Sequence, residues 1–87
     1  MTYFVYLIGS NSKSKFITYV GYTNNLKKRL KLHNSNKGAK STKGYKWKII
    51  FKKEFLKKNE AMSYEHYLKK NRTLRTKIIM KLHKKET

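Results

Sequence analysis

One stretch of the chain, from Tyr19 to His33, constrains the fold more than any other. Its first residues favour a β-strand, and leucines interspersed with basic residues follow Asn24. We expect Gly21 to form a tight turn between the two, because a residue without Cβ lets the backbone and a ligand come close. The helix should run from about Asn24 to Asn34, with a Thr or Asn as its N-cap. This stretch therefore predicts a strand that leads directly into an amphipathic helix.

The predicted helix turns two kinds of side chain toward the same side. Leu26 and Leu30 lie one helical turn apart and mark the core side. Arg29 and His33 are spaced in the same way, and they fall on or beside that side. Burying such groups is costly unless each meets a partner. We therefore expect a cleft that receives an anionic ligand.

The first part of the chain predicts an antiparallel hairpin. The unbroken apolar run Tyr3–Ile8 is typical of a strand covered on both faces, and a polar turn at 9–15 should connect it to a second strand at 16–20. If the hairpin closes symmetrically, Gly9 faces Phe16 and Tyr6 lies directly opposite Tyr19. A register slip of two would instead leave the two tyrosines as diagonal neighbours.

The remaining elements complete an α+β fold of order β-β-α-β-α-α, a small antiparallel sheet with helices packed on it. After a mobile basic loop at 34–46, a third strand is expected at 47–55, with Ile49 and Phe51 alternating against lysines. Asn59 should cap a helix at 60–71. Thr73 should cap a last helix that runs to about 83, with Ile78, Ile79 and Leu82 as its apolar contacts. One domain should span 1–87, with its core at about 3–71 and its C-terminal helix at about 73–84.

The composition points to a polyanionic partner. Lys and Arg number 23 against four acidic residues, which gives a formal net charge of +19. Nucleic acid is the natural partner for such a small basic domain, although a Lys-rich surface that only aids solubility is the plainer alternative. The chain has no Cys, and neither a membrane-spanning run nor a secretory signal is evident, so we expect a cytoplasmic protein, associated with the nucleoid if it is bacterial.

The few acidic residues limit the chemistry. Glu54, Glu60 and Glu86 suit a strand edge, a first helical turn and the tail, which leaves Glu65 on the same face as Ala61. A carboxylate there has either a cationic partner or a metal ion. A site with two metal ions needs more carboxylates, but one Glu suits a single Mg²⁺ whose shell is completed by water and phosphate. The scattered residues His33, His66 and His83 form no zinc-binding pattern, and the last two are expected at the helix surface.

The order of motifs resembles the GIY-YIG nuclease superfamily. The matching residues are Phe4-Val5-Tyr6, Tyr19-Val20-Gly21, Arg29 with His33, and Glu65. The loop at 37–42 and the helix around Glu65 are similar to the small stand-alone branch of the superfamily, which is YhbQ-like and UPF0213-like. The resemblance implies a three-stranded antiparallel sheet flanked by helices, and an endonuclease of the kind used in DNA repair or recombination.

The resemblance also implies roles for individual side chains. Tyr6 would be the general base and Tyr19 would lie beside the attacking water. Arg29 would bind the scissile phosphate, and His33 would support the base or the phosphate. Glu65 would hold one divalent ion, Mg²⁺ or Mn²⁺. DNA is favoured over RNA as the substrate, and the residues expected to grip it are Lys37, Lys40, Lys43, Lys46, Lys69 and Lys70.

This sequence departs from the family pattern at two places. Phe4 replaces the Gly of the first motif, a change that is common in this branch. Many members carry an Asn about a dozen residues after the Glu, whereas that region here holds Lys77, so we expect low activity. A nucleic-acid-binding module that does not cleave is the main alternative, with Tyr45 or Trp47 stacking on bases unless Trp47 belongs to the core. A toxin-like or mobile-element component with a separately encoded partner is a weaker one.

Overall fold

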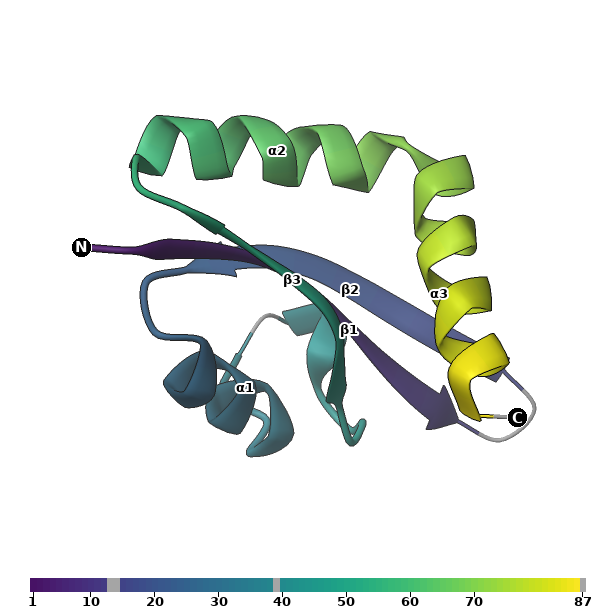
Figure 1. Cartoon of the computed structure of the whole chain (residues 1–87). Coiled ribbons are helices and arrows are strands. Elements are labelled where there is room, and N and C mark those ends of the chain that lie inside the picture. Colours follow the sequence, from purple (N-terminus) through teal and green to yellow (C-terminus); the bar gives the residue numbers. More distant parts are fainter. Residues whose placement is uncertain (13–14, 39, 87) are drawn as a thin grey trace.

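A computed structural model describes residues 1–12, 15–38 and 40–86, with the side chains at 12, 41 and 82–86 left undescribed. The elements follow the expected order and are β1 (Tyr3–Ser12), β2 (Lys15–Thr23), α1 (Leu26–Asn34), a short 3-10 turn (Lys40–Thr42), β3 (Lys48–Phe55), α2 (Lys58–Lys70) and α3 (Arg72–Glu86). The three strands form one antiparallel sheet of order β2-β1-β3 (Figure 1). The α+β fold predicted from the sequence is therefore confirmed.

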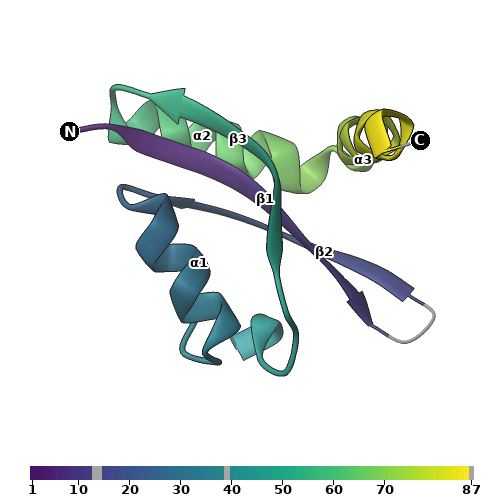
Figure 2. The same ribbon diagram turned by 60° about the horizontal axis from the view of Figure 1, so that its bottom comes forward.

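Helices cover both faces of the sheet. Figure 2 shows α2 and α3 on one face and α1 with the following loop on the other. Alternation along the central strand explains the two cores, because Val5 and Leu7 face α2 while Tyr6 and Ile8 face α1. The apolar run at the start of the chain is thus buried on both faces, as its composition predicts.

The pairing of β1 with β2 corrects the symmetric register. Tyr6 pairs with Gly21, and Ile8 pairs with Tyr19, so the two tyrosines are diagonal neighbours on one face. The slip of two that the sequence left open is the correct register. Space explains the pairing: a Cβ built on Gly21 would lie 2.4 Å from the Tyr6 hydroxyl, so a residue with a side chain would displace the phenol.

The prediction that Gly21 forms a turn is wrong. It lies inside β2, and the group that approaches it closely is the Tyr6 ring. The chain turns two residues later, where the backbone N–H of Asn25 donates to Thr23 Oγ1 at 3.1 Å. Asn25 then caps α1, since its Oδ1 accepts from the backbone N–H of Lys28 at 3.1 Å. The expected Asn cap is confirmed.

The caps of the other two helices differ from prediction. Helix α2 begins at Lys58 without a side-chain cap, one residue before the expected cap Asn59. Helix α3 begins at Arg72, and Asn71 rather than Thr73 lies at its start, with Oδ1 accepting from the backbone N–H of Leu74 at 3.0 Å. These are local errors, because several Asn and Thr residues near a helix start are equally able to cap it.

The alternation expected in β3 is interrupted. The pairing of β1 with β3 shifts between Leu7 and Ile8, so Ile50 and Phe51 both pack toward the α2 core. Ile49 is 37% exposed, contrary to the prediction that it faces the core. A bulge changes which side of the strand each residue faces, and the local sequence carries no sign of it.

Helix α3 extends the core beside α2. Leu74 and Ile78 pack against it, and of these Ile78 is one of the apolar contacts predicted for this helix. The side chains of Leu82 and His83 lie outside the described residues. No helix among the described residues is both long enough and apolar enough to cross a membrane.

Substitution of Leu68 by Ala tests the core under α2. Leu68 is 0% exposed, so we expect Leu68→Ala to lower the free energy of unfolding by about 2–5 kcal/mol in urea denaturation. Leu56→Ala is the matched control, because Leu56 is 82% exposed and its loss should change stability by no more than about 0.5 kcal/mol. Equal effects of the two variants would contradict this packing.

Candidate active site

Tyr6 is the centre of the candidate site. It lies on the central strand, is buried, and directs its hydroxyl oxygen to within 2.8 Å of His33 Nε2. Its ring also approaches Tyr19, with 6.5 Å between the ring centroids. The sheet thus places one phenol in the interior and a second, partly exposed phenol beside it.

His33 is buried by the loop that follows α1. It occupies the last turn of the helix and is 0% exposed. Its Nδ1 lies 2.9 Å from the hydroxyl oxygen of Thr42, a second buried polar residue. The backbone of Gly38 passes so close to the ring that a Cβ there would lie 2.4 Å from Nδ1. Both ring nitrogens therefore face a hydroxyl group.

Arg29 lies one helical turn before His33 and faces the two phenols. Its guanidinium group lies beside the hydroxyl groups of Tyr6 and Tyr19, and their interaction raises the pKa of Arg29. Its Nε is buried and has no hydrogen-bond partner among the described residues. A buried N–H without a partner is costly, which makes this group a candidate donor to an anionic ligand.

Burial and charge set the protonation of the cluster. Burial raises the pKa of Tyr6 most, the Arg29 guanidinium opposes that rise, and the charges of Tyr19 and Glu65 add to it. Burial, together with the Arg29 charge, lowers the pKa of His33. Near neutral pH, Tyr6 therefore keeps its proton and His33 is uncharged.

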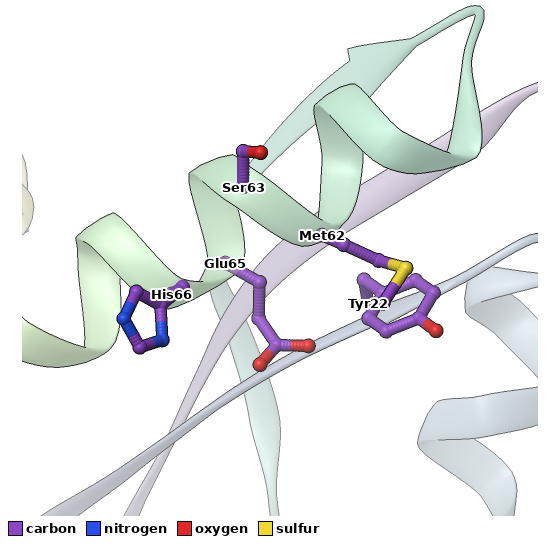
Figure 3. A pocket seen from close by; sticks show the side chains of 5 residues that line it. All are labelled: Tyr22, Met62, Ser63, Glu65 and His66. Carbon is purple, nitrogen blue, oxygen red and sulfur yellow. The ribbon is translucent and has the colours of Figure 1, made fainter.

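Glu65 faces an open hollow on the other side of the sheet. Its side chain is 17% exposed, and it lines the hollow together with Tyr22, Met62, Ser63 and His66. Figure 3 shows the Glu65 carboxylate directed toward Tyr22, with the exposed His66 ring farther along α2. Lys69 Nζ lies 2.9 Å from Glu65 Oε1, so the cationic partner that the sequence allowed for is present.

Tyr22 connects this hollow with Arg29, and the sequence did not single it out. It lines a second hollow with Tyr3, Thr23, Asn24, Arg29 and Lys58. Tyr22 pairs with Val5, so its side chain lies on the face of the sheet opposite Tyr6. Gly21 precedes it in β2 and pairs with Tyr6. Period-two alternation after Val20 could have placed Tyr22 on the face of Glu65, but nothing in the sequence marks it as a wall shared by two hollows.

The predicted site residues thus fall into two groups. Tyr6, Tyr19, Arg29 and His33 form one cluster, whereas Glu65 lies in the hollow on the α2 side and acts on Tyr6 through its charge. One carboxylate here could hold a hard cation that keeps most of its water. No group of three or more His, Cys, Asp and Glu side chains that could hold a metal ion occurs in the described part of the chain.

Described residues of the basic loop and its ends pack against the site. The Asn34 side chain donates to the carbonyl of Trp47 at 3.0 Å and accepts from its N–H at 2.5 Å. Trp47 belongs to the core around Tyr6, while the Tyr45 ring packs on it with centroids 5.8 Å apart. The core role for Trp47 is confirmed, so base stacking by this ring is not available in this arrangement.

The lysines expected to bind nucleic acid are all exposed but occupy two layers. The set in the loop on the α1 side consists of Lys37, Lys40, Lys43 and Lys46. The set in the last turn of α2, on the opposite side of the sheet, consists of Lys69 and Lys70. Lys69 is the residue paired with Glu65. A nucleic acid that contacted both sets would have to pass around an edge of the sheet.

Known proteins similar to this chain share one family. A family model described as the GIY-YIG catalytic domain matches residues 2–78. The UPF0213 protein OB0043 of Oceanobacillus iheyensis is 40% identical over 68 residues, which are 77% of this chain and 76% of that protein. The UPF0213 protein YazA of Bacillus subtilis is 53% identical over 53 residues, 60% of this chain and 54% of that protein.

A solved structure gives the same result for the fold. The solution NMR structure of the UPF0213 protein BH0048 from Bacillus halodurans superposes with a TM-score of 0.54 at 30% sequence identity. The superposition covers 92% of this chain and 84% of that one. The shared architecture therefore extends over nearly the whole chain.

The lowered pKa of His33 predicts acid sensitivity. Below the ordinary pKa of about 6.5 the unfolded chain takes up a proton at this residue before the folded protein does, so stability should fall as the pH falls. Urea unfolding between about pH 7.5 and pH 5.5 should show this loss in the wild type, and His33→Gln should flatten it. An equally steep loss in His33→Gln would assign the effect to another group.

Proposed function

This chain belongs to the GIY-YIG family, and on that basis we propose that it is a metal-dependent endonuclease that hydrolyses phosphodiester bonds in nucleic acid. The observation that carries the proposal is the contact of one buried phenol with both His33 and Arg29. These groups give a proton acceptor and an anion-binding group at the same atom, which is what water attack on a phosphodiester requires.

Tyr6 is the proposed general base, with His33 as the group that takes up its proton. As the water oxygen forms a bond to phosphorus, the Tyr6 oxygen accepts a proton from that water and passes its own proton to His33 Nε2, 2.8 Å away. One bridging P–O bond breaks, and its oxygen leaves with the bonding electrons and takes a proton from solvent. A neutral His33 suits this role, because only an unprotonated nitrogen can accept.

Arg29 is the proposed phosphate-binding group. Its guanidinium already faces the oxygens of Tyr6 and Tyr19, so a phosphate bound to it would lie beside both phenols. The buried Nε without a described partner adds a donor for the charge that grows on the phosphate oxygens during attack. Tyr19, which is partly exposed, would then contact the attacking water.

Glu65 is the residue proposed to hold one divalent ion, Mg²⁺ or Mn²⁺. A single carboxylate in an open hollow fits a hard cation whose remaining positions are taken by water and phosphate oxygens, and Lys69 competes for the same oxygen. When bound, such an ion neutralises charge on the phosphate and the leaving oxygen. Tyr22 would position the carboxylate, since it shares the hollow with Glu65 and the neighbouring one with Arg29.

The substrate proposed is DNA, and the whole basic surface would contribute to binding it. A net charge of +19 on 87 residues favours phosphate contacts, which make binding strongly salt-dependent. The lysines of the loop lie on the side of α1 and would grip the backbone near Arg29. Because Lys77 stands in the region where many members carry an Asn, we propose slow turnover.

A non-cleaving binding module on the same fold remains the second candidate. It is favoured by the ion pair that already occupies Glu65, which would serve stability alone in such a protein. This candidate predicts salt-dependent DNA binding that Glu65→Gln leaves unchanged or improves slightly, since a negative charge is lost.

Replacement of Glu65 by Gln separates the two candidates. With nicked, flapped and plasmid DNA in Mg²⁺ or Mn²⁺, we expect Glu65→Gln to lower the cleavage rate by more than about 100-fold while DNA affinity is kept, because the amide lacks the charge that holds the cation. Glu60→Gln is the matched control, since it removes the same charge from an exposed position of the same helix and should cleave at the wild-type rate.

Two outcomes would contradict the proposal. Cleavage that survives in Glu65→Gln would show that the activity comes from another site or from a contaminant. Tight, salt-sensitive DNA binding by a wild-type protein that cleaves none of the substrates in either metal would favour the binding module.

A further inference from the structure

Thr42 is a buried polar residue in the basic loop. Its neighbour Lys43 is exposed, whereas Thr42 itself is 0% exposed. A short polar side chain is buried only when its hydroxyl finds a partner, and here Oγ1 lies 2.9 Å from His33 Nδ1. The Thr42 carbonyl accepts from the indole N–H of Trp47 at 3.0 Å. The proposed reaction assigns this residue no role.

The hydrogen bonds around Tyr6 determine which nitrogen of His33 carries the proton. Arg29 lies beside the Tyr6 oxygen and has donors but no acceptor, so the Tyr6 O–H is directed to His33 Nε2. Nε2 is therefore the accepting nitrogen. An uncharged imidazole has one proton, which must then lie on Nδ1 and be donated to Thr42 Oγ1.

We infer that Thr42 is a positioning residue: by accepting the Nδ1 proton of His33 it fixes the tautomer whose Nε2 takes up the proton of Tyr6. This inference deepens the proposed function and rests on it. Without the Thr42 hydroxyl, His33 gains the alternative tautomer, in which Nε2–H donates to Tyr6 and the nitrogen that faces Tyr6 can no longer accept its proton.

Contacts with neighbouring residues hold Thr42 and the His33 ring in place. The Trp47 indole bonds its carbonyl, and the Asn34 side chain ties the backbone of Trp47 to the end of α1. Gly38 closes over the His33 ring, where a Cβ would meet Nδ1 at 2.4 Å. The ring is thus enclosed on the Nδ1 side, so the threonine hydroxyl is the accessible choice for that proton.

The charged and titratable groups around His33 come from four elements. Tyr6 and Tyr19 face it from β1 and β2, Arg29 from α1, and Glu65 acts on Tyr6 from α2. All of these groups are the same in every Thr42 variant. A difference between variants therefore reports the threonine hydroxyl.

The test compares Thr42→Val, which keeps the shape without the hydroxyl, with Thr42→Ser, which keeps the hydroxyl. In ¹⁵N NMR of the full chain near neutral pH, wild type and Thr42→Ser should show His33 protonated at Nδ1, whereas Thr42→Val should show the Nε2–H form. In DNA cleavage with Mg²⁺, Thr42→Val should lower kcat by about 10–100-fold with little change in KM, and Thr42→Ser should restore it.

The outcomes separate the inference from the proposed function. A wild-type His33 protonated at Nε2 overturns the inference even if Thr42→Val fails to fold. An unchanged His33 tautomer or an unchanged kcat in a folded Thr42→Val also overturns the inference. If the wild type cleaves DNA in the same experiment, the proposed nuclease function still holds. If the wild type does not cleave DNA, the proposed function is wrong, and the Thr42 contact then has no catalytic use.

Discussion

The hydrogen bond between Tyr6 and His33 lies at the centre of the phenol cluster of the candidate site, and much of the structure is arranged around it. It links the central strand to the end of α1, and the strand register, the glycine opposite Tyr6 and the loop behind His33 all make room for it. Because both partners are buried, the bond cannot be exchanged for one to water, and losing either partner would leave an unsatisfied polar group in the core. The same burial gives Tyr6 and His33 the protonation states that proton transfer requires.

The charge distribution separates two tasks in one small domain. A large positive excess favours polyanion binding almost anywhere on the surface, whereas Glu65 is the one partly buried carboxylate among the described residues and faces a hollow beside Tyr22. That carboxylate is placed by α2 on the face opposite the phenols, and Tyr22 and Gly21 at the edge strand lie between the two groups. The ion pair with Lys69 keeps the carboxylate satisfied when no cation is bound.

Prediction from the sequence succeeded where a residue pattern fits only one structural arrangement. The apolar run around Val5 predicted a strand buried on both faces, and the spacing of Arg29 and His33 placed both beside the core side of α1. It failed where several local arrangements have similar free energies. The hairpin register, the caps at Asn59 and Thr73 and the facing of Ile49 depend on the space opposite Tyr6, on competing side chains and on a bulge. Thr42 and Tyr22 were missed because a lone Thr in a basic loop and one of several tyrosines carry no local mark.

The sequence by itself determined the order of elements, the strongly basic character and the short inventory of groups able to do chemistry, because these follow from periodicity and composition. The tertiary structure alone decided which groups meet. Tyr6 contacts His33 because a glycine stands opposite it, His33 is buried against Gly38 and Thr42, and Glu65 faces a different layer from the phenols. These relations join residues far apart in the chain, and their geometry depends on register and packing that no local pattern encodes.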